Sequence, residues 1–67
     1  MMIIEPQAVS IGLLTVDEVA ERLRRTPTAV RHLIASNQLK SGRVGGRRMV
    51  RESDLYAFVE AAFSEAS

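Results

Sequence analysis

The sequence predicts a small, mainly helical domain with three helices and one short β-hairpin between the second and third helix. Two helix-start signals, at Thr15 and Thr26, lie close together, and Gly45-Gly46 separates two short runs of strand-like residues. A last apolar stripe begins at Leu55. The 67 residues include no cysteine and one histidine, so packing must hold this single domain together without a disulfide or a zinc site.

Residues 1–12 are predicted to form an N-terminal arm before the domain at residues 13–67. Pro6 and Gly12 break any regular period, although Ile3, Ile4, Val9 and Ile11 are apolar enough to favour a covered position. Four alternatives stay open for the arm: packing on its own domain, pairing as a short strand, contacting a neighbouring copy, or fraying. The opening residues lack the basic region of a signal peptide, and no apolar run is long enough to span a bilayer. We therefore expect an intracellular domain.

The first helix is predicted from about Val16 to Arg24. Thr15 and Glu18 form a capping box, in which the threonine hydroxyl accepts from the Glu18 N–H and the Glu18 carboxylate accepts from the Thr15 N–H. Leu14 before the cap and Val19 within the helix have the spacing of a hydrophobic staple. Four residues follow the spacing of one buried face, namely Val16, Val19, Ala20 and Leu23.

A second helix is predicted directly after a very short turn. Thr26 is the expected N-cap and Pro27 the first helical residue, where its missing N–H costs nothing. At 100° per residue, one face carries Val30, Leu33 and Ile34. The opposite face is basic, polar and small, and consists of Thr28, Arg31, His32 and Ala35. Two helices joined by a tight turn, the second with such a face, are typical of helix-turn-helix DNA readers.

The segment from Leu39 to Val50 is predicted to form a hairpin that turns at Gly45-Gly46, where glycine tolerates the positive φ of a tight turn. Alternation places Arg48 and Val50 on one side and Arg47 and Met49 on the other. Val50 can then enter the core while arginines project near the tip, as in a basic wing. A phosphate-binding loop is a weak alternative, because the glycines lack the Gly-Lys-Ser/Thr ending.

A third helix is predicted to close the domain. Glu52, Ser53 and Asp54 suit a first helical turn, where acidic groups are favourable against the helix dipole. A buried stripe is expected at Leu55, Phe58, Val59, Ala62 and Ala66. Tyr56 and Phe63 are interpreted as a flanking strip at the core edge, with contact to a partner as the alternative.

Charge is strongly segregated along the chain. All nine arginines and lysines lie from Arg22 to Arg51, where no acidic residue occurs, and all eight acidic residues lie outside this block. The net charge of +1 hides this separation. Clustered like charges repel, which favours a polyanionic partner such as nucleic acid or an acidic membrane over a solvated basic face without a partner.

Catalytic and metal-binding patterns do not stand out in the sequence. With one histidine and no cysteine, no set of nucleophile, base and orienting group is recognisable, and the carboxylates cluster at helix starts. His32 lacks companion ligands, so a polar contact to nucleic acid or simple solvation is favoured over metal binding. We therefore expect that the protein is not an enzyme and that it binds neither a cofactor nor a small-molecule ligand.

Four segments together carry a resemblance to a known family. They are Leu13 to Leu23, Thr26 to Ile34, Gly42 to Arg48, and Ser53-Asp54-Leu55. The chain resembles the excisionase-type, MerR-like winged helix-turn-helix domains over residues 13 to about 60. It departs from them at Arg24, where glycine is common in the family, and at Arg48, where an aromatic residue is common.

The resemblance implies that the second helix is the recognition helix in the major groove, with Thr28, Arg31 and His32 as base or backbone contacts. It likewise implies that Arg43, Arg47 and Arg48 are wing contacts. Arg25 and Thr26, at the turn between the helices, complete the expected DNA-binding set.

The resemblance also implies a role. The sequence leaves no residues for a coiled coil or an effector domain, so we expect a recombination directionality factor that binds repeated sites, bends DNA and helps an integrase, in the cytoplasm of a bacterial host. The expected partners are duplex DNA, an integrase and other copies of the chain. A small repressor is the nearest alternative, and an RNA-binding or protein-interaction adaptor module is an alternative of another class.

Overall fold

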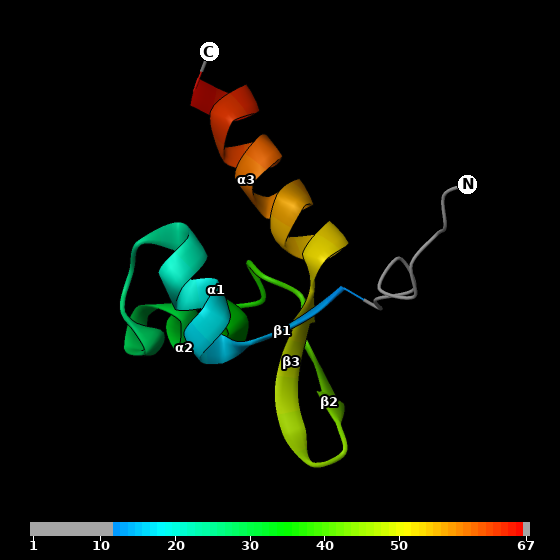
Figure 1. Ribbon diagram of the computed structural model, residues 1–67. Coiled ribbons are helices and arrows are strands. Elements are labelled where there is room, and N and C mark those ends of the chain that lie inside the picture. The colour runs from blue at the N-terminus through cyan, green and yellow to red at the C-terminus, as the bar shows by residue number, and fades with distance from the viewer. Residues whose placement is uncertain (1–11, 67) are drawn as a thin grey trace, which may run out of the picture.

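The computed structural model describes the backbone of residues 12–66 and the side chains of residues 12–64. Its elements are, in order, β1 (Leu13–Thr15), α1 (Val16–Leu23), α2 (Pro27–Ala35), β2 (Gly42–Val44), β3 (Arg47–Arg51) and α3 (Glu52–Ala66). Figure 1 shows α1 and α2 packed beside the sheet, the β2–β3 hairpin extending from one end, and α3 rising from the other. The fold class predicted from the sequence, three helices and a small antiparallel wing, is confirmed. Of the predicted arm, only Gly12 lies within the described residues.

Helices α1 and α2 begin with the predicted caps. The Thr15 hydroxyl accepts from the Glu18 N–H at 3.1 Å, and the Glu18 carboxylate accepts from the Thr15 N–H at 2.8 Å, which completes the capping box. Thr26 caps α2 by accepting from the Ala29 N–H at 3.1 Å, and Pro27 is the first residue of α2. These caps satisfy backbone donors that have no partner inside their own helix.

A residue with left-handed backbone lies just beyond the end of each of these helices. At the end of α1, Arg24 has φ 58 and ψ 42, the Arg24 N–H donates to Glu21 O, and the Arg25 N–H donates to Ala20 O. These two bonds form a Schellman motif. Helix α1 therefore stops at Leu23, one residue earlier than predicted, and Arg24 adopts the conformation for which glycine is usually selected. Asn37, with φ 65, has the same role after α2.

The sheet has a third strand that was not predicted. Its order is β1-β3-β2, with both pairs antiparallel, so β3 is the central strand. Leu14 pairs with Val50 across β1 and β3, and Arg43 pairs with Arg48 across β2 and β3. Gly12 O then accepts from the Glu52 N–H at 2.7 Å, which joins the chain before β1 to the first residue of α3. The predicted Leu39–Val44 strand is in fact shorter, because β2 begins at Gly42.

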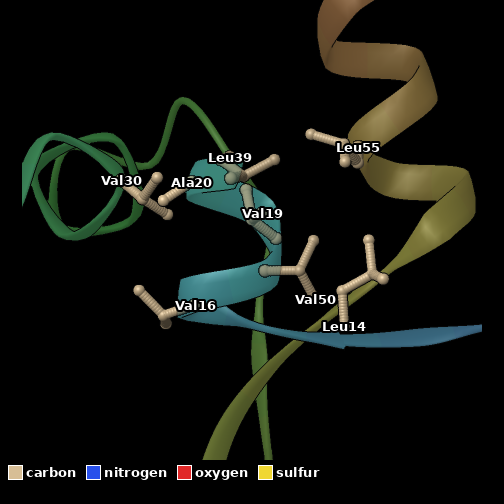
Figure 2. Close-up of a cluster of buried hydrophobic side chains, with 8 residues drawn as sticks. All are labelled: Leu14, Val16, Val19, Ala20, Val30, Leu39, Val50 and Leu55. Carbon is tan, nitrogen blue, oxygen red and sulfur yellow. The ribbon is translucent and has the colours of Figure 1, made fainter. Parts of the chain in front are cut away.

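A single cluster of small aliphatic side chains forms the core. Figure 2 shows its members converging from β1, α1, α2, β3, α3 and the loop after α2: Leu14, Val16, Val19, Ala20, Val30, Leu39, Val50 and Leu55. Leu39 is only 2% exposed, although the sequence placed it in a hairpin strand. Val50 is fully buried, as the alternation in the hairpin predicted.

The predicted apolar stripe of α3 is only partly buried. Leu55 belongs to the core, and Phe58 and Val59 pack against it. Ala62 is exposed, contrary to expectation, because α3 continues past the last element on which it could pack (Figure 1). Ala66 falls outside the described side chains. Tyr56 and Phe63 are 68% and 73% exposed, so their placement at the core edge was wrong.

The left-handed Arg24 leads to a stability prediction. We expect Arg24→Gly to be more stable than Arg24→Ala by about 1 kcal/mol. A residue with a Cβ atom is disfavoured in this conformation by about 1 to 2 kcal/mol, but glycine loses more conformational entropy on folding, which cancels part of that difference. Urea unfolding of both variants measures the difference. Both substitutions remove the same charge, so equal stabilities would show that Arg24 is not strained.

Candidate nucleic-acid interface

The outward face of α2 is fully accessible. Val30 is buried on the inner side, whereas Thr28, Arg31, His32 and Ala35 are all exposed. Thr28 and Ala35 flank Arg31 along this face and are small, so another surface can approach the helix closely there. The major groove of B-DNA is wide enough to admit an α-helix, so this face of α2 suits an approach to base edges there.

The β2–β3 hairpin presents arginines on both of its faces. Gly45 and Gly46, with φ 60 and 86, form the turn. Arg43 lies directly across from Arg48, and Val44 directly across from Arg47, so the two pairs face opposite sides. Like charges at directly opposed positions destabilise a hairpin, and a bound polyanion would remove that repulsion.

Arginines from α2 and β3 meet at one groove. Arg31, Arg47 and Arg48 line it, and the start of α1, from Thr15 to Asp17, lines its other side. A second groove adjoins the first through Arg48 and is also lined by Lys40, Ser41 and Arg51. The structure therefore brings Arg31 beside two neighbouring arginines, Arg47 and Arg48, that are distant from it in the sequence.

All eight predicted DNA-binding residues are exposed, but they are not all in these grooves. Arg31, Arg47 and Arg48 converge, while Thr28 and His32 lie along the open face of α2. Arg25 and Thr26 lie at the turn that precedes α2, and Arg43 lies on β2. The sequence did not single out Asp17, Lys40 or Ser41, because only the folded chain brings these residues beside Arg31 and Arg48.

Intramolecular contacts divide the basic block into two groups. Two arginines are paired with the first turn of α3: Arg22 Nη1 lies 3.5 Å from Glu52 Oε2, and Arg51 Nε lies 2.8 Å from Asp54 Oδ2. In the hairpin, Arg43 Nη1 donates to Gly46 O at 3.0 Å and Arg48 Nη1 donates to Ser41 Oγ at 3.3 Å.

Neither Arg31 nor Arg47 makes a side-chain hydrogen bond or ion pair within residues 12–66. Exposed bonds such as that of Arg48 to Ser41 exchange readily for a bond to phosphate. Arg24 and Arg25 at the turn before α2 and Lys40 in the loop after it also make no side-chain hydrogen bond or ion pair within residues 12–66, so the available cations are spread over that turn, α2, the loop and the hairpin.

Two further findings concern the part of the chain that the structure describes. No group of three or more histidine, cysteine, aspartate or glutamate residues there could hold a metal ion. No helix among those residues is long and apolar enough to cross a membrane.

The geometry is that of a helix-turn-helix domain with a wing: α1 and α2 are joined by a tight turn, and a hairpin lies beside the second helix. A helix-turn-helix domain family model matches residues 13–62, and the chain belongs to this family. Neither the curated proteins nor the solved structures include a significant match. Helix-turn-helix domains bind duplex DNA through the second helix, so DNA is the expected partner.

The position of Arg47 and Arg48 predicts a loss of DNA affinity without a loss of fold. We expect the wild type to make about four to six phosphate contacts, so the logarithm of its affinity should fall with the logarithm of the salt concentration with a slope near −4 to −5. Each phosphate contact that a substitution removes should make this slope shallower by about one unit. The variant Arg47→Ala with Arg48→Ala should bind more weakly with a shallower slope, while its stability stays within about 0.5 kcal/mol per substitution. Fluorescence anisotropy at several salt concentrations and thermal unfolding measure these quantities.

A charge-matched control is Arg22→Ala with Arg51→Ala. It also removes two positive charges, but from side chains that are paired with α3 and do not line the groove shared by Arg31, Arg47 and Arg48. Equal losses of affinity in the two double variants would show that net charge, rather than the groove, determines binding.

Proposed function

We propose that this chain reads duplex DNA in a sequence-specific way, with α2 in the major groove and the hairpin over the adjacent backbone and minor groove. The observation that carries the proposal is the convergence of Arg31, Arg47 and Arg48 at one groove. A phosphate strand lying along that groove would meet Arg31 from α2 and Arg47 and Arg48 from β3. The exposed face of α2 would then meet base edges, where a guanidinium recognises guanine in a bidentate way.

We further propose that the chain acts as a recombination directionality factor, or excisionase: it binds repeated sites, bends the DNA and helps an integrase excise a mobile element. The resemblance described above supports this role. One recognition helix with few base contacts offers little selectivity, so several copies on adjacent repeats would supply the rest. A small repressor would use the same surface, and the two roles differ in whether the DNA is bent by an array.

The role is tested by titrating the protein onto DNA with several adjacent repeats. We expect a monomer in solution, cooperative occupation of the repeats and a progressive bend of the DNA. Bending costs of the order of 1 to 6 kcal/mol per 20–30 base pairs, and contacts between copies would offset this cost. Gel shift with circularly permuted fragments and analytical ultracentrifugation measure these properties. Independent filling without a bend, or a stable symmetric dimer in solution, would favour the repressor. Tighter binding to single-stranded RNA than to duplex DNA would favour an RNA-binding module.

Sequence selectivity should depend on Arg31. We expect Arg31→Ala to lose about 1 to 3 kcal/mol on the preferred site and much less on unrelated duplex, because a base contact adds to discrimination while a phosphate contact does not. Arg22→Ala removes the same charge from a side chain that is paired with Glu52, and it should change both affinities little. Anisotropy titrations with the two duplexes compare the variants. The same loss on both duplexes for Arg31→Ala would make Arg31 a phosphate contact.

A further inference from the structure

One carboxylate lies among the arginines of the candidate interface. We call the groove that is lined by Arg31, Arg47 and Arg48 the arginine groove. Among the described residues, Asp17 is the only acidic residue that lines it. Thr15 pairs with Met49 across β1 and β3, which places the start of α1 beside this part of β3. The arginine groove therefore has a cationic side, formed by α2 and β3, and an acidic side, formed by the first turn of α1.

The negative charge of Asp17 is not used to cap α1. Thr15 and Glu18 complete the capping box without it, and Glu18 also places an acidic group in the first turn of the helix. The Asp17 side chain is exposed and makes no hydrogen bond or ion pair within residues 12–66. Its charge therefore acts on whatever group enters the arginine groove.

A carboxylate in a groove that attracts phosphate limits where the phosphate can lie. Arg47 and Arg48 attract a phosphate towards β3, whereas Asp17 repels it from α1, because like charges repel at close range. A DNA strand in the arginine groove is therefore held on the β3 side. The position of the strand across the groove also determines where the outward face of α2 meets the base edges, since α2 forms part of the same groove.

We propose that Asp17 is a positioning residue that increases sequence selectivity by excluding the DNA backbone from the α1 side of the arginine groove. On a preferred site, the base contact of Arg31 holds the strand on the β3 side, and salt screens the remaining repulsion from Asp17. On an unrelated duplex no base contact fixes the strand, so positions that bring a phosphate to Asp17 are lost. The carboxylate thus lowers affinity for unrelated DNA more than affinity for the preferred site. The inference rests on the proposed function, because it requires a DNA strand in the groove.

The test is Asp17→Asn, measured by fluorescence anisotropy on a preferred site selected from random duplexes and on an unrelated duplex of equal length. We expect affinity for the unrelated duplex to rise about fivefold, because positions beside α1 become accessible to phosphate. Its salt slope should become steeper by about one unit, as expected for one further phosphate contact. Affinity for the preferred site should change by less than about twofold, so the ratio of the two affinities falls.

Three further variants serve as controls. Asp17→Ala should reproduce Asp17→Asn, and because alanine suits a helix and cannot bond to a base, their agreement attributes the effect to charge. Asp17→Glu keeps the charge and should keep the wild-type ratio of affinities. Glu60→Gln on α3 removes one negative charge from an exposed residue outside the arginine groove, and it should leave the ratio unchanged. Thermal unfolding of each variant verifies that it is folded.

The outcomes separate this inference from the proposed function. If Asp17→Asn and Asp17→Ala raise affinity for both duplexes equally, or no more than Glu60→Gln does, Asp17 acts through net charge alone and the inference is overturned. If both variants lose affinity for the preferred site alone, Asp17 instead accepts a hydrogen bond from a base, which also overturns it. If the wild type prefers no duplex, or binds equally well at all salt concentrations, the proposed function itself fails.

Discussion

The burial of Val50 at the centre of the sheet is the interaction on which the rest of the structure depends. Strand β3 pairs with β1 on one edge and β2 on the other, and it leads without a linker into α3. Because side chains alternate along a strand, placing Val50 in the core also determines the sides on which Arg47 and Arg48 leave the backbone. A slip of one residue would turn Val50 out and bury an arginine or Met49. Packing of one valine therefore orients the arginines of the candidate interface.

A second constraint comes from the turn between α1 and α2. The turn is so short that the chain reverses within Arg24 to Thr26, and the reversal requires the left-handed backbone at Arg24. An arginine in this position is disfavoured relative to glycine, but its cation lies at the negative end of the α1 dipole. Ala20 and Val30, both small, are buried where the two helices meet, so α2 can approach α1 closely. The angle at which α2 presents its outward face follows from these two features.

The sequence was sufficient for features that depend on near neighbours. The capping box at Thr15, the start of α2 at Pro27 and the turn at Gly45-Gly46 each arise from the chemistry of a few adjacent residues, and the structure has all three. Strand β1 was missed because it is only three residues long and is defined by its pairing with β3, which is distant in the chain. The predicted burial of Ala62 failed because a helical period shows which side is apolar without showing how far the supporting surface extends.

Which arginines of the basic block form ion pairs also depends on contacts that the sequence alone does not display. In the sequence, Arg22 and Arg51 look equivalent to Arg31 and Arg47, since all belong to one segment without acidic residues. Folding brings Glu52 in the first turn of α3 beside the distant Arg22, while Asp54 pairs with Arg51 only three residues before it. The grooves beside α2 contain residues from several elements, so no local pattern could have indicated that Arg31 and Arg48 share a surface.

The distribution of charge also restricts how the molecule can approach a polyanion. The acidic residues on the described surface gather on α1 and α3, whereas the cations outside the two ion pairs lie on the turn between α1 and α2, on α2, in the loop after it and on the hairpin. Because the whole chain carries only +1, attraction to DNA depends on orientation, and an approach with α3 towards the phosphates is repelled. The same repulsion keeps the exposed rings of Tyr56 and Phe63 directed away from the duplex. Those rings therefore stay available for contact with protein when the cationic surface is occupied by DNA.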